Sequence, residues 1–242
     1  MSNPTASVAP VVAAKELLDA VWRQIGGAFS ATGGFPFPKR VFWLNGAPGA
    51  GKGTHTPVIQ RHLGVEAAPV VTSDLLKSPQ ARALIDAGKL VGDSEVAALL
   101  LEKLAEPCYR EGVIVDGFPR TAVQAEFLRL LHHRLAGLAR DSGGRFAAPE
   151  FRVGTLLVDE DESARRQLQR GREAAAAGQG ARKTDTDEEL ARRRHRIFMA
   201  ETVEPLRALR GHFPYHEINT TGEKPEVAAR IAGALAKGVS PR

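Results

Sequence analysis

Apolar residues occur along the chain in two patterns, as short continuous runs and as longer stretches in which they recur every three or four positions. The continuous runs are "RVFWLN" (40–45), "EAAPVVTS" (66–73), "GVIVDGF" (112–118), "FRVGTLLVD" (151–159) and "YHEINTT" (215–221). Short apolar runs bounded by turn residues are typical of buried strands, and strands separated by helices predict a parallel sheet covered on both faces. We therefore expect an α/β fold with a parallel five-stranded sheet in three αβα layers.

Helical spacing predicts the segments between the strands: 52–64, 74–106 with a break around 86–93, 121–140, 161–171, 187–211 and 224–238. Segment 173–186, "EAAAAGQGARKTDT", has no periodicity and is expected to be irregular. Near the start, residues 10–29 have helical spacing, and the Gly/Pro-rich segment 30–39 follows them. Residues 1–9 are expected to be disordered. The pattern thus predicts a helical extension and linker over 1–38 and a main domain over 39–242.

The segment "GAPGAGKGT" (46–54) directly follows the first apolar run. Glycines in a turn between a strand and a helix let backbone N–H groups contact phosphate oxygens, and the positive end of the helix dipole points to the same place. Lys52 adds a full charge for the β- and γ-phosphates, and the Thr54 hydroxyl is suited to ligate Mg²⁺. The sequence therefore predicts a P-loop that binds a nucleoside triphosphate.

This P-loop resembles that of adenylate kinases and related nucleoside monophosphate kinases, and three further blocks resemble the same family in the same order. They are "TSDLLK" (72–77), "DAGKLVGD" (86–93) and "VIVDGFPRTAVQAEFL" (113–128). The resemblance extends over roughly residues 40–235. It implies a P-loop kinase domain with a small acceptor-binding insert at about 73–92 and a lid at about 171–183. It also implies the reaction ATP + AMP ⇌ 2 ADP, whose catalysis depends mostly on positioning and charge neutralisation.

The resemblance assigns residues to two nucleotides. For ATP it implies the whole loop (Gly46, Ala47, Pro48, Gly49, Ala50, Gly51, Lys52, Gly53, Thr54), together with Arg166, Lys224 and Pro225. For AMP it implies Thr72, Lys77, Lys89, Leu90, Val91, Gly117, Arg120 and Gln124. Arg120 resembles the arginine that clamps the acceptor phosphate, Gln124 the glutamine that binds the acceptor base, and Asp116 a carboxylate that holds Mg²⁺ through water.

An arginine cluster between Arg165 and Arg196 is interpreted through the same resemblance. Arg166 is expected to stack on the donor base, while Arg170, Arg182 and Arg194 would surround the transferred phosphoryl group. Arg194 is preferred to Arg192 and Arg193 by its register with Glu189, Phe198 and Thr202. The catalytic set is then Lys52, Asp116, Arg120, Arg170, Arg182 and Arg194. The alternative for each lid arginine is a solvated charge on a helix face.

The chain departs from the family pattern in three respects. The acceptor-binding insert is shorter than usual, Lys77 stands where an arginine is typical, and the lid lacks the cysteines of zinc-binding lids. A lysine keeps the charge of the arginine but loses its bidentate fork. The shorter insert leaves fewer residues to close over the base, so we expect weak AMP affinity. The alternatives to an adenylate kinase are a UMP/CMP-type kinase and a nucleotide-binding sensor or partner protein with weak or lost turnover. A nucleic-acid-binding ATPase is a weaker third interpretation.

Composition limits the remaining possibilities. The chain has 242 residues, a formal net charge of +5 and one cysteine, Cys108, so an intramolecular disulfide and a thiolate zinc cluster are excluded. No apolar segment reaches the roughly 18 residues of a membrane span, and the N-terminus does not resemble a signal peptide. We expect a cytoplasmic enzyme that uses Mg²⁺ with ATP and binds neither nucleic acid nor membrane. A monomer is expected, with dimerisation through the N-terminal helix as the alternative.

Overall fold

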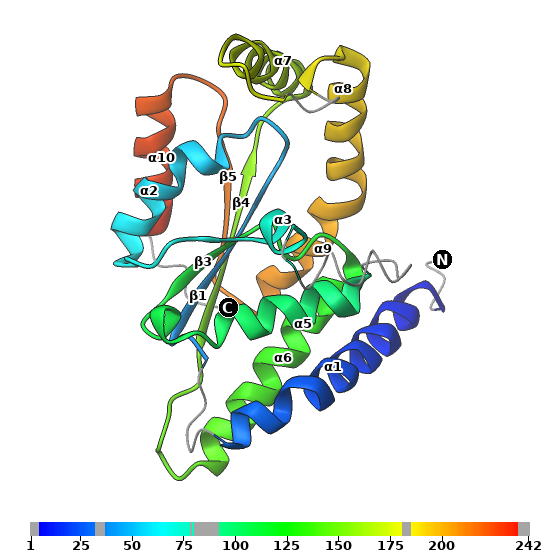
Figure 1. Cartoon of the computed structure of the whole chain (residues 1–242), viewed down its shortest axis with the longest axis vertical. Coiled ribbons are helices and arrows are strands. Elements are labelled where there is room, and N and C mark those ends of the chain that lie inside the picture. The colour runs from blue at the N-terminus through cyan, green and yellow to red at the C-terminus, as the bar shows by residue number, and fades with distance from the viewer. Residues whose placement is uncertain (1–4, 32–36, 78, 80–91, 181–184, 237–242) are drawn as a thin grey trace. The chain divides into compact units, whose positions relative to one another are not determined.

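The protein contains a five-stranded sheet with the strand order β2-β3-β1-β4-β5 (Figure 1). The computed structural model describes residues 5–31, 37–77, 79, 92–180 and 185–236. β2 pairs with β3 in parallel, as does β4 with β5, with Leu157 opposite Asn219 at the end of the second pair. The α/β class and the five strands predicted from the sequence are confirmed. No helix within the described residues is both long enough and apolar enough to cross a membrane.

The chain divides into two compact units: unit 1 combines Met1–Trp43 with Val65–Arg152, and unit 2 combines Leu44–Gly64 with Val153–Arg242. β1 (Arg40–Gly46) and β4 (Glu150–Leu157) each contribute residues to both units. Each unit contains an element that the sequence links to a nucleotide. The P-loop belongs to unit 2 and the "DGFPR" segment to unit 1.

Unit 1 contains the helices α1 (Thr5–Ala31), α3 (Thr72–Leu75), α5 (Asp93–Leu104) and α6 (Ala122–Asp141), with the strands β2 (Val70–Val71) and β3 (Val113–Asp116). α1 lies along α6 and α5 (Figure 1), and the side chains of Ala14, Leu17, Leu18 and Val21 are buried. The Arg134 guanidinium of α6 lies 4.4 Å from the centre of the Trp22 ring. The apolar face of α1 is therefore covered within the same chain.

An aromatic cluster forms the centre of unit 1. The Trp43 ring lies 5.2 Å from Phe151 and 5.9 Å from Phe118, and Phe118 lies 6.2 Å from Phe127. All four side chains are almost fully buried. Edge-on and tilted contacts at these separations are favourable between aromatic rings. Because Phe118 lies two residues after the end of β3, this packing fixes where the "DGFPR" segment leaves the sheet.

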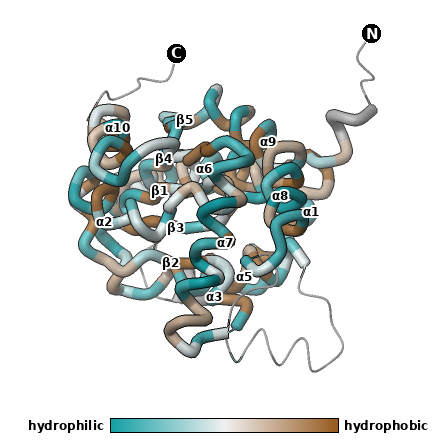
Figure 2. Tube along the Cα trace, turned by 90° about the horizontal axis from the view of Figure 1, so that it is seen from above, coloured by the Kyte–Doolittle hydropathy of each residue, from teal (hydrophilic) through white to brown (hydrophobic). Residues whose placement is uncertain are grey.

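Unit 2 contains α2 (Lys52–Leu63), α7 (Glu160–Ala176), α8 (Glu188–Ile197), α9 (Val203–Ala208), β5 (Tyr215–Asn219) and α10 (Lys224–Ala236). α2 and α10 pack together through buried apolar residues that include Ile59, Val227 and Ile231. In contrast, α7 is largely hydrophilic (Figure 2). Such a helix contributes polar side chains rather than apolar packing.

Several predicted boundaries differ from the structure. α1 already begins at Thr5, so the expectation of disorder over residues 1–9 is wrong for 5–9, where Ala6 and Ala9 favour a helix. The predicted strand 66–73 is reduced to β2, since α3 begins at Thr72. α7 continues to Ala176 through three further alanines, so residues 173–176 are helical rather than irregular, and Gly178 at φ 66° follows its end.

The helix predicted over 187–211 is not uniform. α8 ends at Ile197, a π-helical turn occupies Phe198–Thr202, and a short 3-10 turn (Leu209–Gly211) follows α9. Pro205 has no N–H to donate to the carbonyl four residues earlier, which lies inside the π turn. The interruption therefore coincides with a lost backbone hydrogen bond.

We predict that Leu18→Ala lowers the free energy of unfolding by about 2–4 kcal/mol, because it leaves a cavity where α1 meets the rest of unit 1. Leu18 is 6% exposed. Val12→Ala is the matched control, since Val12 lies on the same helix and is 50% exposed. Urea denaturation measures both variants. Equal effects of the two substitutions would contradict the packing of α1 described above.

Candidate active site

The phosphate-binding loop joins β1 to α2 within unit 2, and backbone hydrogen bonds set its path. Ala47 N–H donates to the Leu156 carbonyl at 2.9 Å, and Ala50 N–H donates to the Ala47 carbonyl at 3.0 Å. Gly49 has φ 74°, and a Cβ there would lie 2.9 Å from the Ser163 carbonyl oxygen. Any other residue at position 49 would be strained and would collide with α7. Glycine is therefore required here by both backbone conformation and space.

Lys52 is the first residue of α2, and its Nζ donates to the Gly46 carbonyl at 2.7 Å. The ammonium group therefore lies against the loop. Thr54 is exposed on the first turn of the same helix. The N-terminus of a helix carries a partial positive charge. The loop therefore combines a lysine, a helix dipole and an exposed hydroxyl, which suits it to bind a polyphosphate.

Two buried polar residues of α7, Ser163 and Gln167, support the loop. The Ser163 hydroxyl donates to the Pro48 carbonyl at 2.7 Å, and the Gln167 amide donates to Ser163 Oγ at 3.2 Å. Gln167 also donates to the Ala191 carbonyl of α8 at 3.2 Å. Both side chains are fully buried. A hydrogen-bonded chain thus connects α8, α7 and the P-loop.

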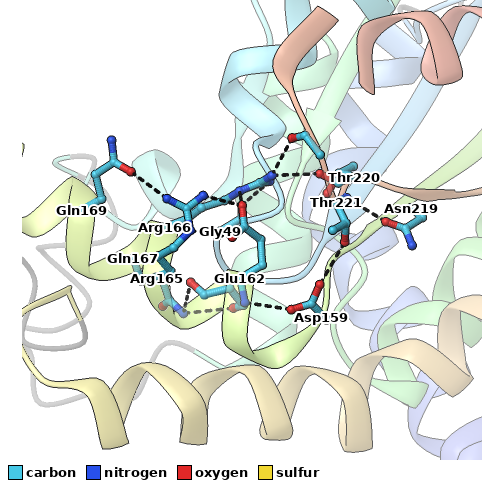
Figure 3. Close-up of polar contacts among 12 residues, drawn as sticks. Gly49, Asp159, Glu162, Arg165, Arg166, Gln167, Gln169, Asn219, Thr220 and Thr221 are labelled. Atoms are coloured by element: carbon cyan, nitrogen blue, oxygen red, sulfur yellow. Dashed lines mark hydrogen bonds and ion pairs between the residues drawn. The ribbon is translucent and has the colours of Figure 1, made fainter. Parts of the chain in front are cut away.

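The Arg166 guanidinium joins the P-loop to the segment before α10 (Figure 3). It donates to the Gly49 carbonyl at 3.3 Å, to the Thr220 and Gly222 carbonyls at 3.1 Å each, and to Glu162 at 2.7 Å. Lys224 and Pro225 are the first residues of α10, directly after this segment. The predicted donor-base residues are therefore brought together. Stacking of Arg166 on a base stays a prediction.

His55 on α2 is buried and lies beside Gly51, where a Cβ would be 3.1 Å from the imidazole ring. Burial lowers the pKa of His55, and the charges of Arg166 and Lys224 lower it further. A neutral imidazole adds no further charge beside Arg166 and Lys224. The ring therefore serves as packing beneath the loop.

Arg170 and Asp185 form a bidentate ion pair across the predicted lid segment. Arg170 Nε and Nη2 donate to the two Asp185 carboxylate oxygens at 2.8 and 2.7 Å. Asp185 is 4% exposed, and a Cβ on Gly171 would overlap its carbonyl oxygen. Planar two-point contacts of this kind hold a carboxylate firmly. The two ends of the segment are thus fastened to each other, and Gly171 allows the close approach.

The arginines of α8 have different surroundings. Arg192 donates to Asp161 at 2.6 Å and to Glu188 at 2.8 Å, and Arg196 donates to Glu160 at 2.9 Å. The pairs with Asp161 and Glu160 tie α8 to the start of α7, which is a structural role. Arg194 is half-buried on the same helix. Arg182, the remaining predicted lid arginine, lies outside the described residues.

The predicted acceptor residues of unit 1 gather where β3 ends and α6 begins. The Thr72 hydroxyl donates to the Asp116 carbonyl at 3.0 Å, and Arg120 Nε donates to the Gly117 carbonyl at 2.7 Å. Gln124 is 6% exposed, and its Oε1 accepts from Arg120 N–H at 2.8 Å. The structure therefore brings together Thr72, Asp116, Gly117, Arg120 and Gln124, while their contacts with a nucleotide stay a prediction.

Lys77 forms an ion pair with a residue outside this group. Its Nζ pairs with Asp74 at 2.8 Å, and both side chains are more than 60% exposed. An exposed pair of this kind is weak and is easily exchanged for another partner. A role of Lys77 in binding the acceptor phosphate stays a prediction. Lys89, Leu90 and Val91 lie outside the described residues.

Known proteins are similar to this chain over most of its length. The family model "Adenylate kinase" matches residues 44–195. The chain belongs to the adenylate kinase family. The adenylate kinase of Deinococcus radiodurans is 36% identical over 81% of this chain and 96% of its own length, and that of Xanthobacter autotrophicus is 35% identical over 80% and 97%. The adenylate kinase of Nocardioides sp. is 32% identical over 79% and 95%.

This adenylate kinase family member is an enzyme that transfers a phosphoryl group to a nucleoside monophosphate. A solved gluconokinase from Sinorhizobium meliloti is also similar, with a TM-score of 0.45 and 17% identity over 83% of this chain and 94% of that chain. A likeness at this level does not bear on the substrate of the kinase.

Four residues of this kinase were missed at the sequence level: His55, Ser163, Gln167 and Asp93. Asp93 accepts a hydrogen bond from Gln124 Nε2 at 2.6 Å. Ser163 and Gln167 are four positions apart on a strongly polar helix, and their complete burial was not visible in its periodicity. The available signal was the spacing of Ser163, Gln167 and Arg170, which places three polar residues on one face of the helix.

We predict that Ser163→Ala raises the KM for ATP several-fold and lowers the free energy of unfolding by about 1–3 kcal/mol, because the Pro48 carbonyl loses its buried donor. The control is Ser142→Ala, which removes another buried hydroxyl, donating to the Ala139 carbonyl at 2.6 Å in unit 1. It should destabilise the protein without changing the KM for ATP. Steady-state kinetics measures the KM for ATP, and denaturation measures the free energy of unfolding. An unchanged KM for ATP in the Ser163 variant would contradict the role of Ser163 in supporting the loop.

The stability supplied by Glu162 should depend on pH. Hydrogen bonds from Arg165, and then from Arg166, lower the pKa of the Glu162 carboxyl to about 2. Because the folded pKa is below the unfolded value, this stability is present above about pH 4.5 and is lost as the pH falls towards 2. The difference in unfolding free energy between wild type and Glu162→Gln should therefore shrink between pH 7 and pH 3. A constant difference over that range would refute the assignment.

Proposed function

We propose that this enzyme transfers the γ-phosphoryl group of Mg-ATP to AMP, forming two molecules of ADP. The family membership supports the phosphotransfer, and the donor half in unit 2 supports ATP as the donor. The observation that carries the choice of AMP is the position of Gln124. Its amide lies at the start of α6 beside Arg120, so a base-binding group and a phosphate-binding group share one turn.

Each half has a defined task under this proposal. The P-loop, held by Leu156 and Ser163, positions the ATP phosphates against Lys52 and the N-terminus of α2. Charge neutralisation by Lys52 and the lid arginines Arg170, Arg182 and Arg194 stabilises the transferred group. Arg166, Lys224 and Pro225 contact the donor base. Thr72, Lys77, Lys89–Val91, Gly117, Arg120 and Gln124 hold AMP.

Magnesium fits the oxygen donors that these residues offer. Thr54 supplies a hydroxyl and Asp116 a carboxylate that acts through water, and both are hard ligands. No group of three or more His, Cys, Asp or Glu side chains suited to a metal occurs among the described residues. A Mg²⁺ ion that is bound mainly by phosphates and water typically has few protein ligands. When bound with ATP, the ion neutralises charge on the β- and γ-phosphates.

The packing of α1 supports a monomer. Its buried side chains, among them Leu17, Leu18 and Val21, are covered by the same chain, so dimerisation is not needed to cover them. Cytoplasmic location and the absence of nucleic-acid binding stay predictions.

A coupled assay with Mg-ATP and a panel of AMP, UMP, CMP and GMP tests the proposal. We expect AMP to have the highest kcat/KM. Faster phosphorylation of UMP or CMP would mean that the acceptor is a pyrimidine nucleotide instead of AMP. No turnover with any of the four nucleotides would favour the nucleotide-sensing alternative.

We predict that Lys52→Ala lowers kcat by roughly 100-fold or more, because a charge that stabilises the transition state is lost. Lys103→Ala is the control, since Lys103 pairs with Glu106 on the surface of unit 1. It should leave kcat unchanged. A Lys52 variant with kcat near wild type would contradict the assignment of the P-loop.

A further inference from the structure

The side-chain amide of Gln124 is held from two sides. Its Nε2 donates to the Asp93 carboxylate at 2.6 Å, and its Oε1 accepts from the backbone N–H of Arg120 at 2.8 Å. Asp93 is the first residue of α5, and Gln124 lies in the first turn of α6. The contact therefore joins the N-termini of two helices directly beside the acceptor residues.

These two partners permit only one orientation of the amide. An ionised carboxylate can only accept hydrogen bonds, and a backbone N–H can only donate them. Turning the amide by 180° would place its oxygen against the Asp93 carboxylate and its NH₂ group against the Arg120 N–H. Gln124, which is only 6% exposed, would then lose both hydrogen bonds. Buried polar groups without partners are costly, so the turned state is disfavoured.

The surroundings of Asp93 reinforce this arrangement. The Thr121 hydroxyl lies 3.4 Å from the second Asp93 carboxylate oxygen, and the same hydroxyl accepts from Gln124 N–H at 3.1 Å. Thr121 is the residue before α6, so it caps the helix that carries Gln124. The carboxylate, the cap and the amide thus form one small network within unit 1.

An amide with a fixed orientation distinguishes between two purine edges. Each amide atom still has one hydrogen-bonding site, an acceptor on Oε1 and a donor on Nε2. Adenine presents a donor at its 6-amino group and an acceptor at N1, whereas hypoxanthine presents an acceptor at O6 and a donor at N1. In a given position of the base, a fixed amide can match one of these edges and not the other, while an amide that turns freely can match both.

We propose that Asp93 is a specificity-determining positioning residue, which holds the Gln124 amide in the orientation that accepts adenine and rejects 6-oxopurines. The proposal rests on AMP as the acceptor. Asp93 acts through Gln124. Replacing the Asp93 carboxylate, which can only accept hydrogen bonds, should therefore reduce discrimination between bases more than it reduces affinity for the phosphate of AMP.

The test measures binding of AMP and of inosine monophosphate to the full-length protein by calorimetry, without ATP. Wild type should bind AMP more tightly. In Asp93→Asn the new side chain both donates and accepts, so the preference for AMP over inosine monophosphate should fall on the order of tenfold. Asp93→Ser, which keeps a small polar residue at this helix start, should also lower the preference for AMP over inosine monophosphate. ATP affinity should be unchanged in both variants.

Glu95→Gln is the matched control. Glu95 lies in the same helical turn and accepts from Gly92 N–H at 3.0 Å, and the substitution makes the same carboxylate-to-amide change. It should keep the wild-type preference. A wild-type preference in both folded Asp93 variants, or an equal loss in the Glu95 variant, would overturn the role of Asp93. A wild-type protein that binds neither nucleotide, or that prefers inosine monophosphate, would instead overturn AMP as the acceptor, and the role of Asp93 with it.

Discussion

The shape of the phosphate-binding loop depends on the donors and acceptors that hold its backbone from β4 and α7. Ala47 is bound to the Leu156 carbonyl, Pro48 to the Ser163 hydroxyl and Gly49 to the Arg166 guanidinium. A loop with so few side chains has little apolar area to bury, so hydrogen bonds must set its conformation. Lys52 and the start of α2 take their positions from it. The proposed donor site in unit 2 thus depends on polar contacts from β4 and from the hydrophilic helix α7.

The proposed acceptor site in unit 1 is built differently. An aromatic cluster around Trp43 and Phe118 fixes where β3 leaves the sheet, and the polar network of Asp93, Thr121 and Gln124 lies at the helix starts beyond it. Apolar packing therefore sets the coarse position of this half, and directional hydrogen bonds set the orientation of single groups. The second kind of contact is the one that can discriminate between bases, because it depends on which partner donates.

Much of this architecture was accessible from the sequence, since buried strands and a glycine-rich loop have strong local patterns. The strands around Trp43, Ile114 and Val153 were predicted within a few residues, and the "DGFPR" segment brought Arg120 and Gln124 to one place. The extension of α7 to Ala176 was missed because a run of alanines has no apolar periodicity, although alanine is the strongest helix former. The roles of Ser163 and Asp93 were not predicted, since they depend on partners more than 30 residues away in sequence.

Whether the acceptor of this kinase is an adenine nucleotide is measured most directly with ADP as the sole nucleotide, in the presence of Mg²⁺, with the mixture followed by ³¹P NMR. With AMP as the acceptor, ADP should be converted into an equilibrium mixture with ATP and AMP, and UDP alone should not be converted. ADP that stays unchanged, in a preparation that phosphorylates UMP or CMP from ATP, would contradict AMP as the acceptor.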